Sequence, residues 1–172
     1  MNFIIAGLGK LDAYLFYKLN KLGHKSLLFK ISFILSKSAD GFWYFLTVPF
    51  LLFDHNSGVQ LIKSLAVSYV IYFPIYYGLK NNLKRPRPFQ KLEDINNLIA
   101  VPDKFSFPSG HTACAFIFSV IISSFHNELA LYLYTWSTLV GLGRVSLGVH
   151  YPSDVLAGAI IGTLCAYIGL GI

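Results

Sequence analysis

A short run of charged residues enclosed by apolar sequence constrains this chain more than any other feature. Residues 144–154 read Arg-Val-Ser-Leu-Gly-Val-His-Tyr-Pro-Ser-Asp and lie between two strongly apolar stretches. A cation, an imidazole and a carboxylate are thus held where the burial of charge is costly. Charged side chains in such surroundings usually belong to a functional site, so we expect Arg144, His150 and Asp154 to share one.

The composition places the chain in a lipid bilayer. Its 172 residues are 55% hydrophobic and 13% charged, with a mean hydropathy of +0.57, whereas a soluble domain carries roughly 25% charged residues. Its length suits one domain, and about five helices of roughly 20 residues would use most of it. We therefore expect an all-α integral-membrane bundle that forms a single domain over residues 1–172.

The apolar segments divide into an N-terminal part and a transmembrane core. Residues 11–22 repeat leucines at helical spacing with lysines on another face, which is typical of an amphipathic helix in the membrane interface. A helix packed on the side of the bundle is the alternative. Residues 26–36 are short and contain Lys30, so residues 1–38 are assigned to an interfacial helical segment. Within the core, residues 39–172, the expected spans are 39–53, 59–79, 109–124, 129–143 and about 153–172.

The number of membrane crossings brings three polar stretches to one face. The longest polar connection covers residues 80–107. The next two helices, 109–124 and 129–143, run out and back, so the connection at 144–152 returns to the side on which Ser109 begins its helix. Charged groups far apart in the sequence are therefore expected to meet there.

The cations on that face predict an anion-binding site. Lys80, Arg87 and Arg144 supply three positive charges, and guanidinium groups suit the oxygens of phosphate. Ser109 and Gly110 begin a helix, where backbone N–H groups and the helix dipole favour an anion. The net charge of +6 in so apolar a chain favours a phosphorylated substrate or an anionic membrane surface over nucleic acid.

Two histidines on this face differ in their neighbours. Asp154 follows His150 by four residues, and a carboxylate bonded to one ring nitrogen makes the other more basic, as a nucleophile that attacks phosphorus requires. His111 has no carboxylate nearby in the sequence, and it could protonate a leaving oxygen and then activate water. The sequence contains no Cys/His spacing typical of a metal site, so we expect no metal and no cofactor.

Each of these residues also has a structural interpretation. A lone histidine at a helix start is more often structural than functional, and Arg144 alone could be an interface anchor. Lys84, Arg85 and Lys91 fit a solvated or lipid-facing basic patch. The coincidence of all these groups at one membrane face is what favours a functional site.

Three gapped motifs in this order resemble the signature of the type 2 phosphatidic acid phosphatase (PAP2) superfamily. Lysine and Arg-Pro are separated by six residues within 80–88, Pro-Ser-Gly-His follows at 108–111, and Arg, His and Asp recur over 144–154. The family pattern usually has serine before the last arginine, where this chain has Gly143, which removes one phosphate hydroxyl. The superfamily also includes soluble vanadium haloperoxidases, and the apolar spans argue against that branch.

The resemblance implies metal-independent hydrolysis of a lipid phosphomonoester or pyrophosphate through a phosphohistidine. It makes His150 the nucleophile, Asp154 its partner and His111 the general acid. It implies no cofactor, and its partners are the lipid substrate and the bilayer, with no obligate protein partner. The implied phosphate ligands are Lys80, Arg87, Ser109, Gly110 and Arg144.

The short chain with its N-terminal helix resembles the small bacterial members, whose substrates include lipid A, undecaprenyl pyrophosphate and phosphatidylglycerophosphate. The dense basic face favours lipid A 1-phosphate among them. A lipid phosphotransferase is the alternative within enzymes, and a non-catalytic protein that binds anionic lipids is the alternative outside them. The intact His150, Asp154 and His111 argue against a non-catalytic protein.

Two indications of membrane orientation disagree. The resemblance implies the bacterial inner membrane with the active site on the extracytoplasmic face. The positive-inside rule indicates the opposite, because every one of the 14 Lys and Arg residues except Lys63 falls on the active-site side. The phosphate-binding cations and the lysines of the interfacial segment need not follow that rule, so the extracytoplasmic placement is retained.

Overall fold

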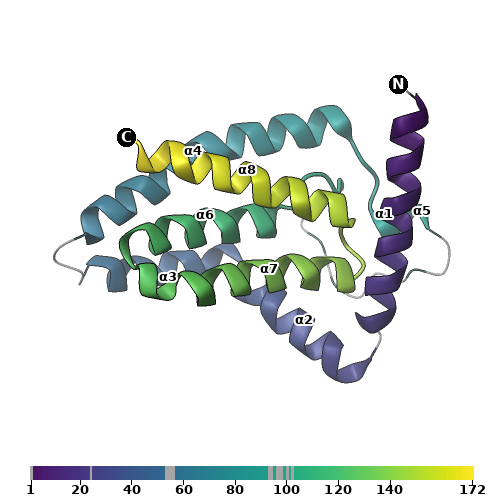
Figure 1. Ribbon diagram of the computed structural model, residues 1–172, viewed down its shortest axis with the longest axis horizontal. Helices are drawn as coiled ribbons and strands as arrows, with labels where there is room; N and C mark the ends of the chain where they lie inside the picture. The colour runs from purple at the N-terminus through teal and green to yellow at the C-terminus, as the bar shows by residue number, and fades with distance from the viewer. Residues whose placement is uncertain are drawn as a thin grey trace.

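Every regular element in the described part of the chain is a helix (Figure 1). The computed structural model describes residues 2–23, 25–52, 57–92, 95, 99, 101 and 103–172. The elements are α1 (Asn2–Gly23), α2 (Ser26–Ser38), α3 (Gly41–Leu52), α4 (Gly58–Leu83), α5 (Pro88–Lys91), α6 (Gly110–Phe125), η1 (Asn127–Leu129), α7 (Ala130–Ser146) and α8 (Pro152–Leu170).

Each apolar segment predicted to cross the membrane forms a helix. Two segments, Gly58–Lys91 and Pro152–Leu170, are long and apolar enough to span a membrane by themselves, and Gly110–Phe125 is a shorter apolar helix. The largest difference from the predicted bounds lies at the end of α4. The helix continues past residue 79 to Leu83, so Lys80 projects from a helical turn and not from a loop.

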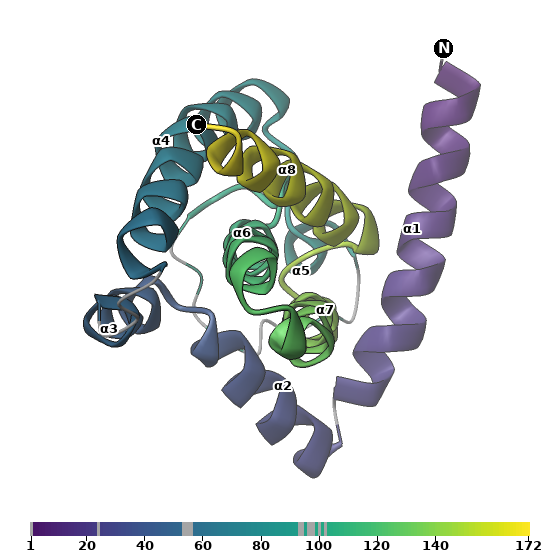
Figure 2. The same cartoon turned by 60° about the vertical axis from the view of Figure 1, so that its left-hand side comes forward.

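The helix α6 lies inside the bundle, surrounded by α4, α7 and α8 (Figure 2). Small residues let α8 approach it closely, as is common in helix pairs within membranes. A Cβ atom at Gly158 or Gly162 would collide with backbone carbonyls at the start of α6. This approach allows the N–H of Ser109 to donate a 3.0 Å hydrogen bond to the carbonyl of Asp154, so the packing of α6 on α8 joins two of the predicted motifs.

Beyond this junction, towards the other end of α6, the core of the bundle is apolar. Buried side chains of α4, α6 and α8 form one cluster, which continues away from the charged end of the bundle. Its members are Leu61, Leu65, Tyr72, Ala113, Ile117, Val120, Ile121, Ile122, Cys165 and Ala166.

The N-terminal helices pack against the end of the bundle that carries the predicted site. The helix α1 contacts α7 and α8, and α2 runs along α7 (Figures 1 and 2). Asn20 donates a 2.9 Å hydrogen bond to the carbonyl of Ser146, and Trp136 donates one of 2.9 Å to the hydroxyl of Ser38. The interfacial location of this segment and its boundary at residue 38 stay predictions, but its contacts tie it to the core.

Candidate active site

A cavity of about 1490 Å³ reaches the charged end of the bundle. Most of the predicted site residues line its polar end, and aromatic and aliphatic side chains of α3, α4 and α6 line the rest. Ile62 and Lys80 of α4 both line it, so at 1.5 Å per residue it extends about 27 Å along that helix. The predicted site residues in its lining are Lys80, Arg87, Gly110, His111, Arg144 and His150.

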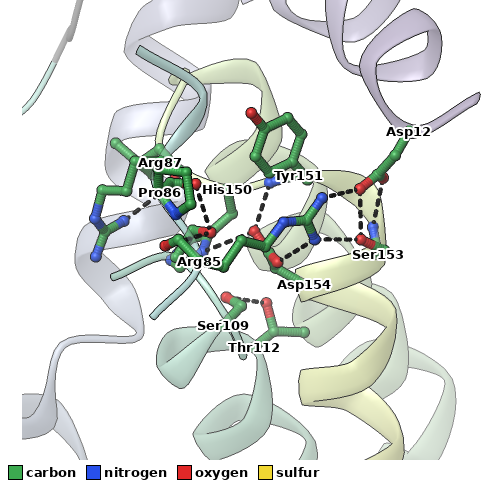
Figure 3. A network of polar contacts seen from close by, with 12 residues as sticks. Asp12, Arg85, Pro86, Arg87, Ser109, Thr112, His150, Tyr151, Ser153 and Asp154 are labelled. Atoms are coloured by element: carbon green, nitrogen blue, oxygen red, sulfur yellow. Dashed lines mark hydrogen bonds and ion pairs between the residues drawn. The ribbon is translucent and has the colours of Figure 1, made fainter. Parts of the chain in front are cut away.

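The two remaining predicted residues lie buried behind the cavity. The carboxylate of Asp154 accepts a 2.8 Å hydrogen bond from the N–H of Tyr151, and the hydroxyl of Ser109 lies 2.9 Å from that of Thr112 (Figure 3). Ser109 and Asp154 are both fully buried. Sequence reasoning missed Thr112, which follows the Pro-Ser-Gly-His motif directly.

His150 and Asp154 lie together but do not form a hydrogen bond. His150 belongs to the connection between α7 and α8, and its Nδ1 atom is 3.7 Å from Oδ2 of Asp154. In the part of the chain that the structure describes, this buried Nδ1 has no hydrogen-bond partner. The two side chains are therefore adjacent, but they are farther apart than a hydrogen bond allows.

The surroundings of His150 keep its imidazole neutral. Burial lowers the pKa of His150 well below its ordinary value, because the charged form loses hydration. The nearby positive charges of Arg144, Arg87 and Lys80 lower this pKa further. A neutral imidazole retains the lone pair that a nucleophile needs.

Two of the predicted phosphate-binding cations share a carboxylate that sequence reasoning missed. Arg87 donates 2.8 Å hydrogen bonds to the carboxylate of Asp103 and to the carbonyl of Val149. Lys80 lies 3.0 Å from the same carboxylate and donates a 2.6 Å bond to the hydroxyl of Tyr76. Burial raises the pKa of Asp103, but Lys80 and Arg87 outweigh it and bring the pKa below its usual value. An ionised carboxylate therefore lies between the two cations.

Arg144 is buried and fixed by the N-terminal segment. Its Nη1 atom donates a 2.7 Å hydrogen bond to the hydroxyl of Ser36 on α2, and its side chain is only 3% exposed. Within the described residues, its Nε atom has no hydrogen-bond partner. The interpretation of Arg144 as an interface anchor that extends to the membrane surface is therefore wrong.

The interpretation of Arg85 as part of a solvated basic patch is also wrong. This side chain donates hydrogen bonds of 2.7 Å to the carboxylate of Asp154 and 2.6 Å to the hydroxyl of Ser153 (Figure 3). Its other end pairs with Asp12 of α1, which also accepts a 2.9 Å bond from the N–H of Ser153. The buried carboxylate beside His150 thus has its own counter-charge, and α1 holds that counter-charge in place.

His111, which has no acidic neighbour in the sequence, acquires one in the fold. Its Nε2 atom is 2.9 Å from Oδ1 of Asp40, in the short connection between α2 and α3. Asp40 also pairs with Lys37 at 3.0 Å. Burial raises the pKa of Asp40, but the hydrogen bonds of His111 and Lys37 more than offset it, so the pKa lies below its ordinary value. Asp40 is therefore a carboxylate at neutral pH.

Together these contacts make a site that contains three buried cations and two histidines. Among the residues described, no group of three or more His, Cys, Asp or Glu side chains could hold a metal ion. The arrangement can bind an anion, supply a neutral imidazole as a nucleophile and exchange a proton through a second imidazole.

The sequence is similar to known membrane phosphatases. A model of the PAP2 superfamily matches residues 57–171. The chain is 27% identical over 138 residues to an undecaprenyl-diphosphatase of Sulfolobus acidocaldarius, covering 76% of this chain and 63% of the relative. It is 27% identical over 150 residues to a lipid A 1-phosphatase of Rhizobium johnstonii, covering 75% and 61%. The chain thus spans less than two thirds of the length of these curated relatives.

The fold is similar to that of a solved structure over nearly the whole chain. The crystal structure of LpxE from Aquifex aeolicus matches with a TM-score of 0.84 and 31% identity, covering 94% of this chain and 96% of that one. This likeness confirms the predicted all-α fold of an integral membrane protein.

Proposed function

The chain belongs to the PAP2 superfamily, and on that premise we propose that it is a lipid phosphatase that acts through a phosphohistidine. One observation carries the proposal: a single cavity has His150, His111 and three cations at its polar end and apolar side chains along the rest. A lipid phosphate has the same division, with a charged headgroup on an apolar chain. The cavity can therefore hold the phosphate at the histidines while the hydrocarbon extends along α3 and α4.

In the first step, the neutral His150 attacks phosphorus through Nε2. A P–N bond forms, the P–O bond to the lipid breaks, and protonated His111 gives its proton to the leaving oxygen. The cations Lys80, Arg87 and Arg144 stabilise the negative charge on the equatorial oxygens of the transition state. The carboxylate of Asp154 stabilises the positive charge that His150 acquires, and we expect the two to approach to hydrogen-bond distance when phosphate binds.

In the second step, water replaces the histidine on phosphorus. His111, now neutral, takes a proton from the attacking water while the P–N bond breaks and His150 recovers its lone pair. Inorganic phosphate leaves and both histidines return to their starting state. A lipid hydroxyl in place of water would make the same site a phosphotransferase.

We propose lipid A 1-phosphate as the substrate, with undecaprenyl diphosphate as the second candidate. Relatives named for each of these activities align with about three quarters of the chain, so sequence similarity supports both. The net charge of +6 and the exposed lysines of α1 favour a headgroup that carries several negative groups.

The test is phosphate release by the detergent-purified protein in the presence of EDTA. The panel is lipid A, undecaprenyl diphosphate, phosphatidylglycerophosphate and phosphatidic acid. We expect release from at least one of them, fastest from lipid A and undiminished by EDTA. Faster release from undecaprenyl diphosphate would replace the substrate and keep the mechanism. Absence of release from all four lipids by a folded protein would contradict the phosphatase proposal and favour a phosphotransferase or a lipid-binding protein.

We also propose that the site faces the extracytoplasmic side of the bacterial inner membrane. The turn between α6 and α7 lies at the opposite end of these helices from His111 and Arg144, so it reports the other side. With the native cysteines replaced, a single cysteine at Glu128 should react with an impermeant maleimide only after the cells are opened. Reaction in intact cells would reverse the orientation, as the distribution of lysine and arginine indicates.

A further inference from the structure

We propose that Asp40 is a positioning residue for His111, so that each histidine of the site works with its own carboxylate. This inference deepens the proposed function and rests on it, because it concerns the residue that exchanges protons with the leaving group and with water. Asp40 lies outside residues 57–171, to which the family model extends. The three sequence motifs do not include it.

Asp40 is held firmly where it meets His111. Its N–H donates a 3.1 Å bond to the carbonyl of Lys37, and its own carbonyl accepts a 3.0 Å bond from Trp43. The preceding helix is anchored on both sides of Lys37, because the hydroxyl of Ser36 accepts from Arg144 and that of Ser38 accepts from Trp136. The 2.9 Å contact to the imidazole therefore joins His111 to a junction whose backbone and neighbours are hydrogen-bonded.

The contact assigns different tasks to the two ring nitrogens of His111. Nε2–H donates to the carboxylate of Asp40, which leaves Nδ1 to exchange protons with the substrate. As the P–O bond breaks, the proton on Nδ1 passes to the leaving oxygen, and in the second step Nδ1 takes a proton from water. Asp40 stays ionised throughout, and it stabilises the imidazolium before each donation.

The charges around His111 make this carboxylate necessary. Arg144 and Lys37 are positive neighbours that oppose a protonated imidazole, and Asp40 is the negative group in direct contact with it. The other two carboxylates of the site are already paired. Asp154 pairs with Arg85, and Asp103 pairs with Lys80 and Arg87. The two pairs therefore differ: His150 is surrounded by cations, whereas His111 has a carboxylate in direct contact that favours its protonated form.

The experiment compares two soluble phosphate esters with the same binding group. Phenyl phosphate has a poor leaving group that requires protonation, and 4-nitrophenyl phosphate has a good one that does not. The variants are Asp40→Asn, which keeps the shape and removes the charge, and Asp40→Glu, which keeps the charge. Glu128→Gln is the matched control, because Glu128 is exposed on the turn after α6.

We expect Asp40→Asn to lower kcat/KM for phenyl phosphate by about 100-fold, the lower range of the effect of general acid catalysis, because kcat/KM reports the steps up to release of the leaving group. The loss of kcat/KM for 4-nitrophenyl phosphate should be below about tenfold. Asp40→Glu should recover most of the activity, and Glu128→Gln should match the wild-type protein.

Two results would overturn the inference while leaving the phosphatase intact. One is an equal loss of kcat/KM for both esters in Asp40→Asn, which would indicate a structural role. The other is wild-type activity of that variant towards phenyl phosphate. If the folded wild-type protein releases phosphate from neither ester and from none of the four lipids, the proposed function itself fails and the inference falls with it.

Discussion

Replacing His150 with alanine is expected to abolish phosphate release from every substrate that the wild-type protein hydrolyses. The imidazole is the only group in the proposed mechanism that forms a bond to phosphorus, and removal of a catalytic nucleophile costs roughly 10⁴-fold or more in kcat. The measurement is the initial rate of phosphate release in detergent, with size-exclusion chromatography and thermal unfolding to confirm that the variant is folded.

The matched control for this variant is His126→Ala. His126 lies just beyond the last residue of α6, at the other end of the helix from His111, and should be replaceable with little loss. A folded His150→Ala protein that keeps more than about a tenth of the wild-type rate would be incompatible with a nucleophilic His150.

Arg87→Lys is expected to lower kcat/KM by roughly 10²- to 10³-fold, the scale seen when one preorganised donor to a transition state is removed. The guanidinium contacts the carbonyl of Val149 and both the carbonyl and the carboxylate of Asp103. A lysine keeps the charge but cannot supply this planar set of donors. The measurement is kcat and KM for the best substrate of the lipid panel, at fixed detergent concentration.

Asp103→Asn separates the two contributions of Arg87. It removes the charge of the carboxylate that pairs with Arg87 and leaves the guanidinium to contact phosphate. We expect a loss below about tenfold, because the interaction with the transition state is the larger effect. Equal losses in Asp103→Asn and Arg87→Lys would show that the ion pair matters in itself, and would contradict a direct contact between Arg87 and phosphate.

The helices of the core were predictable because an apolar environment leaves the backbone few choices. In lipid, each N–H and C=O must be paired within the segment, so an uninterrupted apolar run becomes a helix. Polar residues at the end of such a run are less constrained. The α4 helix therefore continues beyond the predicted end at residue 79 and carries Lys80 on its final turns.

The central residues of the site were predictable because the number of membrane crossings between their motifs brings these motifs to one face. The number of crossings gives the side of the membrane on which a residue lies, but it does not give the helix that packs beside that residue. Two partners, Asp12 on α1 and Asp40 just after α2, depend on how α1 and α2 pack against α7 and α8. No spacing in the sequence encodes that packing.

One signal could have identified these partners. The chain contains only 8 acidic residues, and an acid beside apolar sequence is costly unless it has a function. Asp12, Asp40 and Asp103 all contact a cation or a histidine of the site. Arg85 was misjudged for a related reason, because a basic residue near a polar connection looks solvated until its acidic partners are placed.

The phosphohistidine is the central claim, and trapping it is the most direct test. The protein is mixed with ³²P-labelled substrate, quenched in base within the first turnover and digested. We predict a label that is stable in base and lost in acid, on the peptide containing His150, and absent from His150→Ala. Label on a different residue, or the same label in His150→Ala, would contradict the mechanism.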